Sequence, residues 1–178
     1  MILSVEKLKS YISTDVQDAV LEDKLQALEI LIRKYTNNNF QTRAFRTIGT
    51  CDSDENTITC DTMIPFKVGD TIQISDSKFN PDMLCVITAI NHSILTVDKD
   101  LIDEDNILIT KITYPMDVVM GVVNMMKWDL ENRSKVGIQS ETISRHSVTY
   151  FNMDGDNSLM GYPKSLVGFL KPYMKARF

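Results

Sequence analysis

The sequence contains few residues of the kinds that hold metal ions or build disulfide frameworks. Its 178 residues include three cysteines and two histidines. Cys51, Cys60 and Cys85 lack CxxC spacing, and His92 and His146 are far apart in the chain, so no zinc site is predicted. An odd, sparse set of thiols fits reduced cysteines that pack as small apolar residues. We therefore expect neither a disulfide-stapled fold nor a bound metal.

Long hydrophobic runs are missing as well. No apolar run approaches the roughly 18 residues that a membrane span needs. Residues 1–9 alternate charged and apolar side chains, without the basic and apolar regions of a signal peptide. The chain is expected to act without a membrane and without secretion.

The sequence also lacks the motifs that commonly carry catalysis. It has no GxxxxGK[ST] phosphate loop and no HExxH pair. Residues 152–157 resemble a calcium loop only superficially, because their glycine is at the fourth position and Pro163 stands where a bidentate Glu belongs. Ser144, His146 and Ser147 are not surrounded by a nucleophile elbow. We expect no enzymatic activity and no cofactor.

Charge is distributed unevenly along the chain. The net charge is −5, which argues against simple affinity for a polyanion. Residues 41–116 carry six basic and twelve acidic groups, whereas residues 117–178 carry eight basic and six acidic groups. The last stretch, residues 161–178, has four basic residues and no acidic one. This asymmetry predicts that different faces of the protein meet different partners.

Apolar residues at helical spacing predict four helices. Ser4 is a suitable N-cap for the first, and Pro163 and Pro172 are expected to begin and end a short last helix. Asp18 is a plausible N-cap for the second helix, which the asparagines at 37–39 are expected to end, and the third is expected over residues 116 to about 134. Their apolar stripes, predicted to pack together, are Leu21, Leu25, Leu28 and Ile32 and Val119, Val122 and Met126.

Between these helices the period of the apolar residues changes to that of strands. Short β-rich runs alternate with turns rich in Gly, Pro, Asn and Asp from residue 45 to residue 113. Strands at this spacing are typical of a small antiparallel sheet or barrel. Residues 138–151 alternate again and are expected to be extended.

Together these patterns predict an α+β fold. Its body is expected to be an antiparallel bundle of three to four helices, with an inserted small antiparallel β-sheet or barrel and an extended C-terminal arm. The predicted divisions are a helical hairpin at 1–43, an inserted β-rich domain at 44–114, and a third helix, extended segment and arm at 115–178.

Three segments resemble a known family. Residues 3–12, followed by a gap and the helix that ends near residue 37, resemble the start of tailed-bacteriophage head–tail connector proteins, also called adaptor or head-completion proteins. Residues 137–150 (GIQSETISRHSVTY) are similar to the family's S-E-x-I…S-x-x-Y segment. Residues 161–177 resemble its last helix and tail. Many family members join the second and third helices directly or by a short hairpin, so the β-rich stretch of about 70 residues here departs from the pattern.

The resemblance implies a structural role. Such subunits form a homo-oligomeric ring, commonly a dodecamer, below the portal protein at the head–tail junction of the virion, after synthesis in the bacterial cytoplasm. The ring extends the DNA channel, helps to retain packaged DNA without sequence-specific binding, and docks the tail or a stopper protein. Candidate ring or channel contacts are Glu141, Arg145 and His146. Candidate portal or neighbour contacts are Tyr162, Lys164, Phe169, Lys171, Tyr173, Lys175, Arg177 and Phe178.

One alternative from a different class stays open. The β-rich region is also typical of a small barrel that binds nucleic acid or peptide, carried on a helical scaffold. Its net charge of −6 between residues 41 and 116 disfavours a phosphate-rich ligand.

Overall fold

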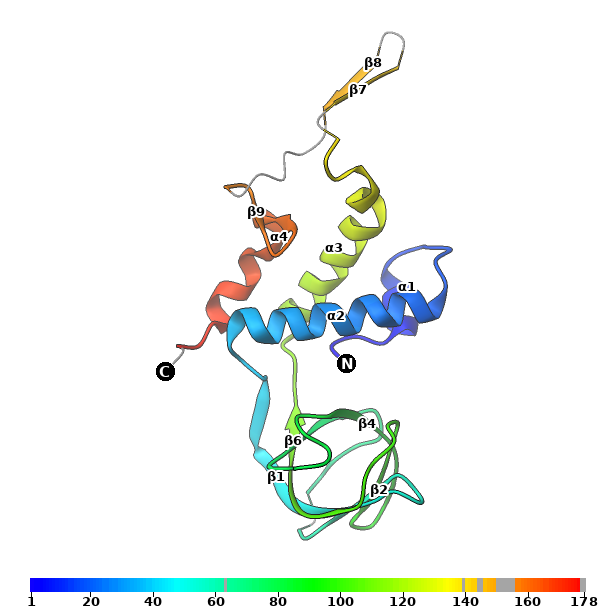
Figure 1. Ribbon diagram of the computed structural model, residues 1–178, viewed down its shortest axis with the longest axis vertical. Coiled ribbons are helices and arrows are strands. Elements are labelled where there is room, and N and C mark those ends of the chain that lie inside the picture. Colours follow the sequence, from blue (N-terminus) through cyan, green and yellow to red (C-terminus); the bar gives the residue numbers. More distant parts are fainter. Residues whose placement is uncertain (63, 139, 144–145, 150–155, 177–178) are drawn as a thin grey trace. The chain divides into compact units, whose positions relative to one another are not determined.

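The chain forms two compact units in the computed structural model, which describes residues 1–62, 64–138, 140–143, 146–149 and 156–176 (Figure 1). The first, here called the barrel unit, comprises Met1 and Asn39–Tyr114. The second, here called the helical unit, comprises Ile2–Asn38 and Pro115–Phe178. The chain therefore leaves the helical unit after its second helix and returns to it at its third.

Six antiparallel strands close into a barrel in the order β1-β2-β5-β4-β3-β6. Closure is complete because β1 pairs with β2 along one edge and with β6 along the other. The strands are β1 (Gln41–Asp52), β2 (Thr57–Cys60), β3 (Thr71–Ser75), β4 (Leu84–Asn91), β5 (Ile94–Val97) and β6 (Glu104–Ile112).

The strand β1 is long and irregular, and it pairs with both β2 and β6. Its register with β6 shifts between Gln41 and Arg46 and again between Gly49 and Cys51, and such bulges bend a strand and increase its twist. A Cβ at Gly49 would lie 2.5 Å from the carbonyl oxygen of Thr59 and 2.8 Å from Cδ1 of Ile109. Glycine is therefore required where β1 turns from one neighbour to the other.

The barrel interior is filled by β-branched side chains. Isoleucines from four strands, namely Ile58, Ile72, Ile74, Ile87, Ile107 and Ile109, are completely buried. The three cysteines lie in the same core as free thiols. Burial raises the pKa of Cys51 and Cys60 to about 11 and that of Cys85 to about 12. The expectation that the cysteines act as apolar core residues is confirmed.

Two long helices form the centre of the helical unit. The helix α2 (Asp18–Thr36) buries Leu21, Leu25, Leu28 and Ile32, and α3 (Met116–Asn132) buries Val119, Val122 and Met126. Both apolar stripes are thus buried as predicted, and the two helices contact each other. Asn37 ends α2 with φ at 49°, the left-handed conformation expected of an asparagine cap.

The remaining elements of the helical unit are short. Ser4 caps α1 (Val5–Tyr11) by accepting a hydrogen bond from the Lys7 N–H. The elements after α3 are η1 (Arg133–Lys135), β7 (Ser140–Ile143), β8 (His146–Thr149), β9 (Ser158–Leu159), β10 (Tyr162–Pro163), α4 (Lys164–Val167) and η2 (Gly168–Tyr173).

The predicted fold class was wrong. The dominant element is a closed six-stranded antiparallel barrel, and the fold is mostly β rather than a helical bundle that carries a small inserted sheet. Among the α-helices of the described residues, α2 and α3 alone exceed two turns, since α1 has seven residues and α4 has four. Helical periodicity was present at both chain ends, but a period alone does not show how many turns a segment completes.

The predicted extended C-terminal arm was wrong as well. One α-helical turn continues as a 3-10 helix through Pro172 to Tyr173, and Tyr162, Val167 and Leu170 are buried. The segment folds back because its apolar side chains find partners within the helical unit.

Candidate assembly surface

The segment that most resembles the connector family contains a two-stranded hairpin. Here β7 and β8 pair antiparallel, with Glu141 opposite Val148 and Ile143 opposite His146. Within the described part of the chain these two strands form a sheet of their own. The sequence predicted an extended stretch, and the structure folds it into a hairpin. The candidate channel residues Glu141 and His146 are therefore brought onto neighbouring strands, while Arg145 lies outside the described residues.

Two aromatic residues of the C-terminal segment, Tyr162 and Phe169, pack within the helical unit. The Tyr162 ring is 5% exposed, and its centroid lies 5.5 Å from that of Trp128. The Phe169 ring covers Gly121 of α3 so closely that a Cβ there would lie 2.2 Å from its Cζ. These two candidate interface residues thus form internal contacts of the helical unit.

The last described residues are attached to the ends of α2 and α3. The Tyr173 hydroxyl donates to the Asp117 carboxylate at 2.7 Å. The Asn38 side chain donates to the Tyr173 carbonyl at 3.1 Å, and the Lys175 N–H donates to the Thr36 carbonyl at 2.8 Å. These bonds hold the segment close to both long helices.

The basic residues of the same segment face outward. Lys164, Lys171 and Lys175 are all exposed, so they keep the positive surface that the sequence predicts. Arg177 and Phe178, the other candidate contacts, lie outside the described residues. Contact of any of these residues with a portal or a neighbouring subunit stays a prediction.

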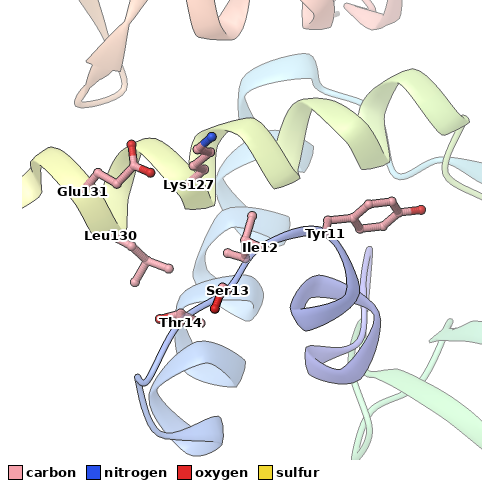
Figure 2. A pocket seen from close by; sticks show the side chains of 7 residues that line it. All are labelled: Tyr11, Ile12, Ser13, Thr14, Lys127, Leu130 and Glu131. Atoms are coloured by element: carbon pink, nitrogen blue, oxygen red, sulfur yellow. The ribbon is translucent and has the colours of Figure 1, made fainter.

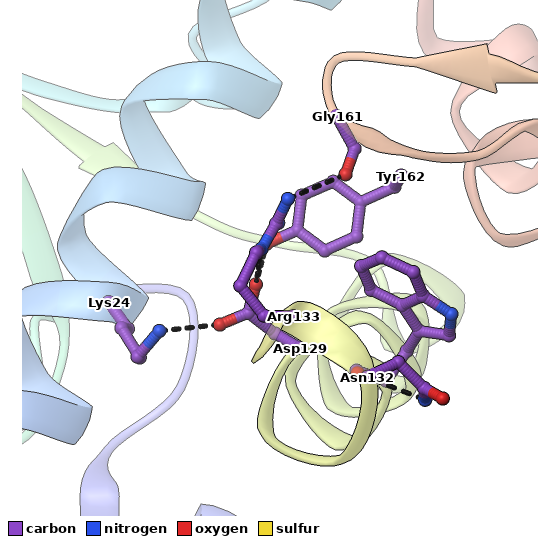
Figure 3. A network of polar contacts seen from close by, with 7 residues as sticks. Lys24, Asp129, Asn132, Arg133, Gly161 and Tyr162 are labelled. Carbon is purple, nitrogen blue, oxygen red and sulfur yellow. Dashed lines mark hydrogen bonds and ion pairs between the residues drawn. The ribbon is translucent and has the colours of Figure 1, made fainter. Parts of the chain in front are cut away.

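A buried carboxylate connects three parts of the helical unit (Figure 3). Asp129 is 5% exposed; its oxygens lie 2.5 Å from Lys24 Nζ of α2 and 2.6 Å from Arg133 Nε one turn along α3. The Tyr162 hydroxyl donates to the same carboxylate at 3.3 Å. Burial alone would raise the pKa of Asp129, but the hydrogen bonds from Lys24 and Arg133 outweigh it and hold the pKa below its ordinary value.

Arg133 also connects the end of α3 to Gly161, on the far side of the hairpin in sequence. Its guanidinium donates to the Gly161 carbonyl at 2.8 Å and lies 5.2 Å from the Trp128 ring centroid and 4.7 Å from that of Tyr162. The hairpin strands fall between Arg133 and Gly161 in sequence. Sequence reasoning missed this network, although an Asp and an Arg at i and i+4 on a helix were visible as a signal.

A concave site of about 360 Å³ lies between the α1–α2 loop and α3 in the helical unit (Figure 2). Tyr11, Ile12, Ser13 and Thr14 line one side, and Lys127, Leu130 and Glu131 line the other. Glu131 has no second carboxylate, histidine or cysteine beside it in this lining. This lining therefore does not contain a set of metal ligands.

Two further observations bear on the expectations about ligands. The described residues contain no group of three His, Cys, Asp or Glu side chains placed to hold a metal ion. No helix in the described part of the chain is both long and apolar enough to cross a bilayer.

Two acidic side chains of the barrel unit, Asp103 and Glu104, accept hydrogen bonds from neighbouring loops. Glu104 accepts hydrogen bonds from the Ser77 hydroxyl and from the N–H groups of Lys78 and Phe79. The hydrogen bonds from Ser77 and Lys78 lower its pKa to about 2. Asp103 likewise accepts the Ser53 N–H at 2.7 Å. These carboxylates therefore hold the backbone of neighbouring loops in place.

The fold and these surfaces define a closed β-barrel joined to a helical unit that carries a separate hairpin. No protein-family model matches the chain, and a search of curated proteins finds no sequence match. The resemblance to the connector family thus rests on the residue pattern alone.

Proposed function

We propose that the chain is a structural subunit of a head–tail connector ring of a tailed bacteriophage. In this proposal the ring lies below the portal, extends the DNA channel, helps to retain packaged DNA and docks the tail or a stopper. The observation that carries the proposal is the separate β7–β8 hairpin, because it falls in the segment that most resembles the family, residues 137–150.

Physical chemistry makes such a hairpin a natural assembly element. Each of its strands has four residues, and an isolated two-stranded hairpin is at best marginally stable in water. Its outer edges present backbone N–H and C=O groups that another chain can pair with. A neighbouring subunit or the portal would supply the missing partner, and in a ring every copy would gain it at once.

The charge of the chain supports a channel that does not bind DNA tightly. With a net charge of −5, a ring of many copies is strongly acidic and repels the phosphate backbone. DNA would then pass through without sequence-specific contacts. The exposed lysines of the C-terminal segment are suited to an acidic protein surface instead.

The alternative function is a binding module formed by the barrel. It is favoured by the closed barrel itself and by the exposed apolar residues Phe79 and Ile102 on its loops. The two proposals predict different assemblies, since a binding module acts as a single copy and a connector acts as a ring.

Co-expression with the portal protein of the same genome tests the proposal. Native mass spectrometry and electron microscopy should show many copies of the chain as a ring on each portal. Replacing residues 140–149 with a Gly-Ser linker should abolish this complex while leaving the helical circular dichroism unchanged. The matched control replaces exposed Ile138, just outside the hairpin, with Ser and should assemble normally. A genome without a portal gene, or a single copy bound per portal, would contradict the proposal.

A further inference from the structure

Two loops of the barrel unit present large apolar side chains to solvent. Phe79, between β3 and β4, is 49% exposed, and Ile102, between β5 and β6, is 53% exposed. The loops are joined through Asn80, which is completely buried. Its side chain donates to the Ile102 carbonyl at 2.8 Å and accepts the Ile102 N–H at 2.9 Å. Phe79 and Ile102 therefore lie on one continuous surface, here called the Phe79 platform.

The platform is held rigidly for a solvent-exposed surface. The Glu104 carboxylate accepts hydrogen bonds from the backbone N–H groups of Lys78 at 2.6 Å and Phe79 at 3.2 Å, and these bonds fix the conformation of the β3–β4 loop. The Lys78 ammonium lies 5.0 Å from the Phe79 ring centroid. A partner that binds a preorganised aromatic side chain loses little conformational entropy, and such residues often dominate binding energies.

The rim of the platform is acidic. Asp76, Asp103 and Asp105 flank Phe79 and Ile102 in sequence and all three are exposed, so the rim is net negative although Lys78 is exposed as well. The ligand that fits this surface is an apolar side chain flanked by positive charges.

The C-terminal segment of the same chain has that chemistry. Met174 is 49% exposed, and Lys171 and Lys175 beside it are exposed as well. No acidic residue occurs from residue 161 to the end of the chain. A methionine sulfur makes favourable contacts with aromatic rings, and the flexible side chain adapts to the surface that it meets.

We infer that the Phe79 platform of one copy binds the Met174 surface, with Lys171 and Lys175, of a second copy. The inference rests on the proposed function, because a contact between two different surfaces joins subunits head to tail, as a ring requires. The two surfaces are complementary in charge and share an apolar centre. A single contact of this size is weak, and closure of a ring strengthens it by repetition.

Disulfide trapping tests the contact directly in the full-length chain. The three native thiols are buried and have raised pKa values, so an introduced cysteine is the one that reacts. Mixing Ile102→Cys with Met174→Cys under mild oxidation should give the mixed disulfide dimer. The matched control pairs Met174→Cys with Val68→Cys, a residue that is 62% exposed elsewhere on the barrel unit.

The expected yield of the Ile102→Cys mixture is about tenfold above that of the Val68→Cys mixture, the ratio that corresponds to a modest binding preference. Equal yields would overturn the inference. Preferential Ile102→Cys homodimers would overturn it as well, since they would show that two platforms meet each other.

A second measurement separates this inference from the proposed function. Phe79→Ser removes the exposed anchor without touching the barrel core, and its melting temperature should match that of wild type. It should reduce the copies bound per portal, whereas Val68→Ser should not. If Phe79→Ser forms normal rings on the portal, the interface is wrong and the connector role stands. If the trapped dimer forms but no portal is bound, the contact stands and the connector role is wrong.

Discussion

Replacing Asp129 with Ala should destabilise the helical unit more than any neighbouring surface change. The substitution removes the carboxylate that Lys24, Arg133 and Tyr162 share. Breaking a buried ion pair by removing one partner typically costs about 3–5 kcal/mol. The side chains of Lys24 and Arg133 are 36% and 39% exposed, so both regain water. We therefore expect a loss of about 2–3 kcal/mol.

Urea unfolding followed by helical circular dichroism measures this loss, because the long helices belong to the unit that contains Asp129. Glu131→Ala is the control, since Glu131 is an exposed carboxylate two residues further along α3. Its effect should stay within about 0.5 kcal/mol. In a double-mutant cycle, Asp129→Ala and Lys24→Ala should be clearly non-additive. Additive effects, or an Asp129→Ala variant as stable as the control, would refute the assignment of this network as a structural clamp.

The pH dependence of a second, isosteric variant, Asp129→Asn, provides an independent check. The pKa of Asp129 is lowered in the folded state from its ordinary value of 3.8. Its stabilising contribution is therefore fully present above that value and is lost as the pH falls through the lower, folded-state pKa. The difference in stability between wild type and Asp129→Asn should shrink below pH 3.8. A difference that grows on acidification would contradict the direction of the shift.

Three further predictions concern other parts of the chain. Gly121→Val should lower the free energy of unfolding by about 1–3 kcal/mol through overpacking, because the Phe169 ring occupies the space beside Gly121. The double variant Gly121→Val, Phe169→Ala should lose less stability in urea unfolding than the two single variants lose together. The three buried thiols should not react with Ellman's reagent at neutral pH until denaturant is added, and a fast reaction in the folded protein would contradict their burial. Glu104 has its pKa lowered to about 2, so its contribution to barrel stability is present above its ordinary value of 4.5 and lost on acidification. The melting temperature of Glu104→Gln should consequently fall less than that of wild type between pH 5 and pH 2.

Local patterns were sufficient to locate most of the elements. The apolar period located α2 and α3, and the alternation of β-rich runs with turn signals between residues 45 and 113 located most of the region that forms the barrel strands. Asn37 takes the left-handed conformation that its position after α2 predicts. Each of these features depends on neighbours a few residues away, which is the range over which helix caps, turns and periodicity act.

The same patterns were a poor guide to which partners each element would have. The hairpin of β7 and β8 was expected as one extended stretch, because alternation does not show where a strand reverses. The C-terminal aromatics were expected to face outward, and Tyr162 and Phe169 instead pack against α3. An aromatic residue next to lysines is typical of an interface and equally compatible with a core.

The sequence by itself determined where the chain is helical, where it is extended, and how its charge is divided between an acidic middle and a basic end. Only the tertiary structure decided that β1 pairs with both β2 and β6 to close the barrel, and that Asp129 meets Lys24 across 105 positions of the chain. The physical reason is that such contacts depend on register, bulges and burial, which many distant residues set together. No local period or propensity contains that information.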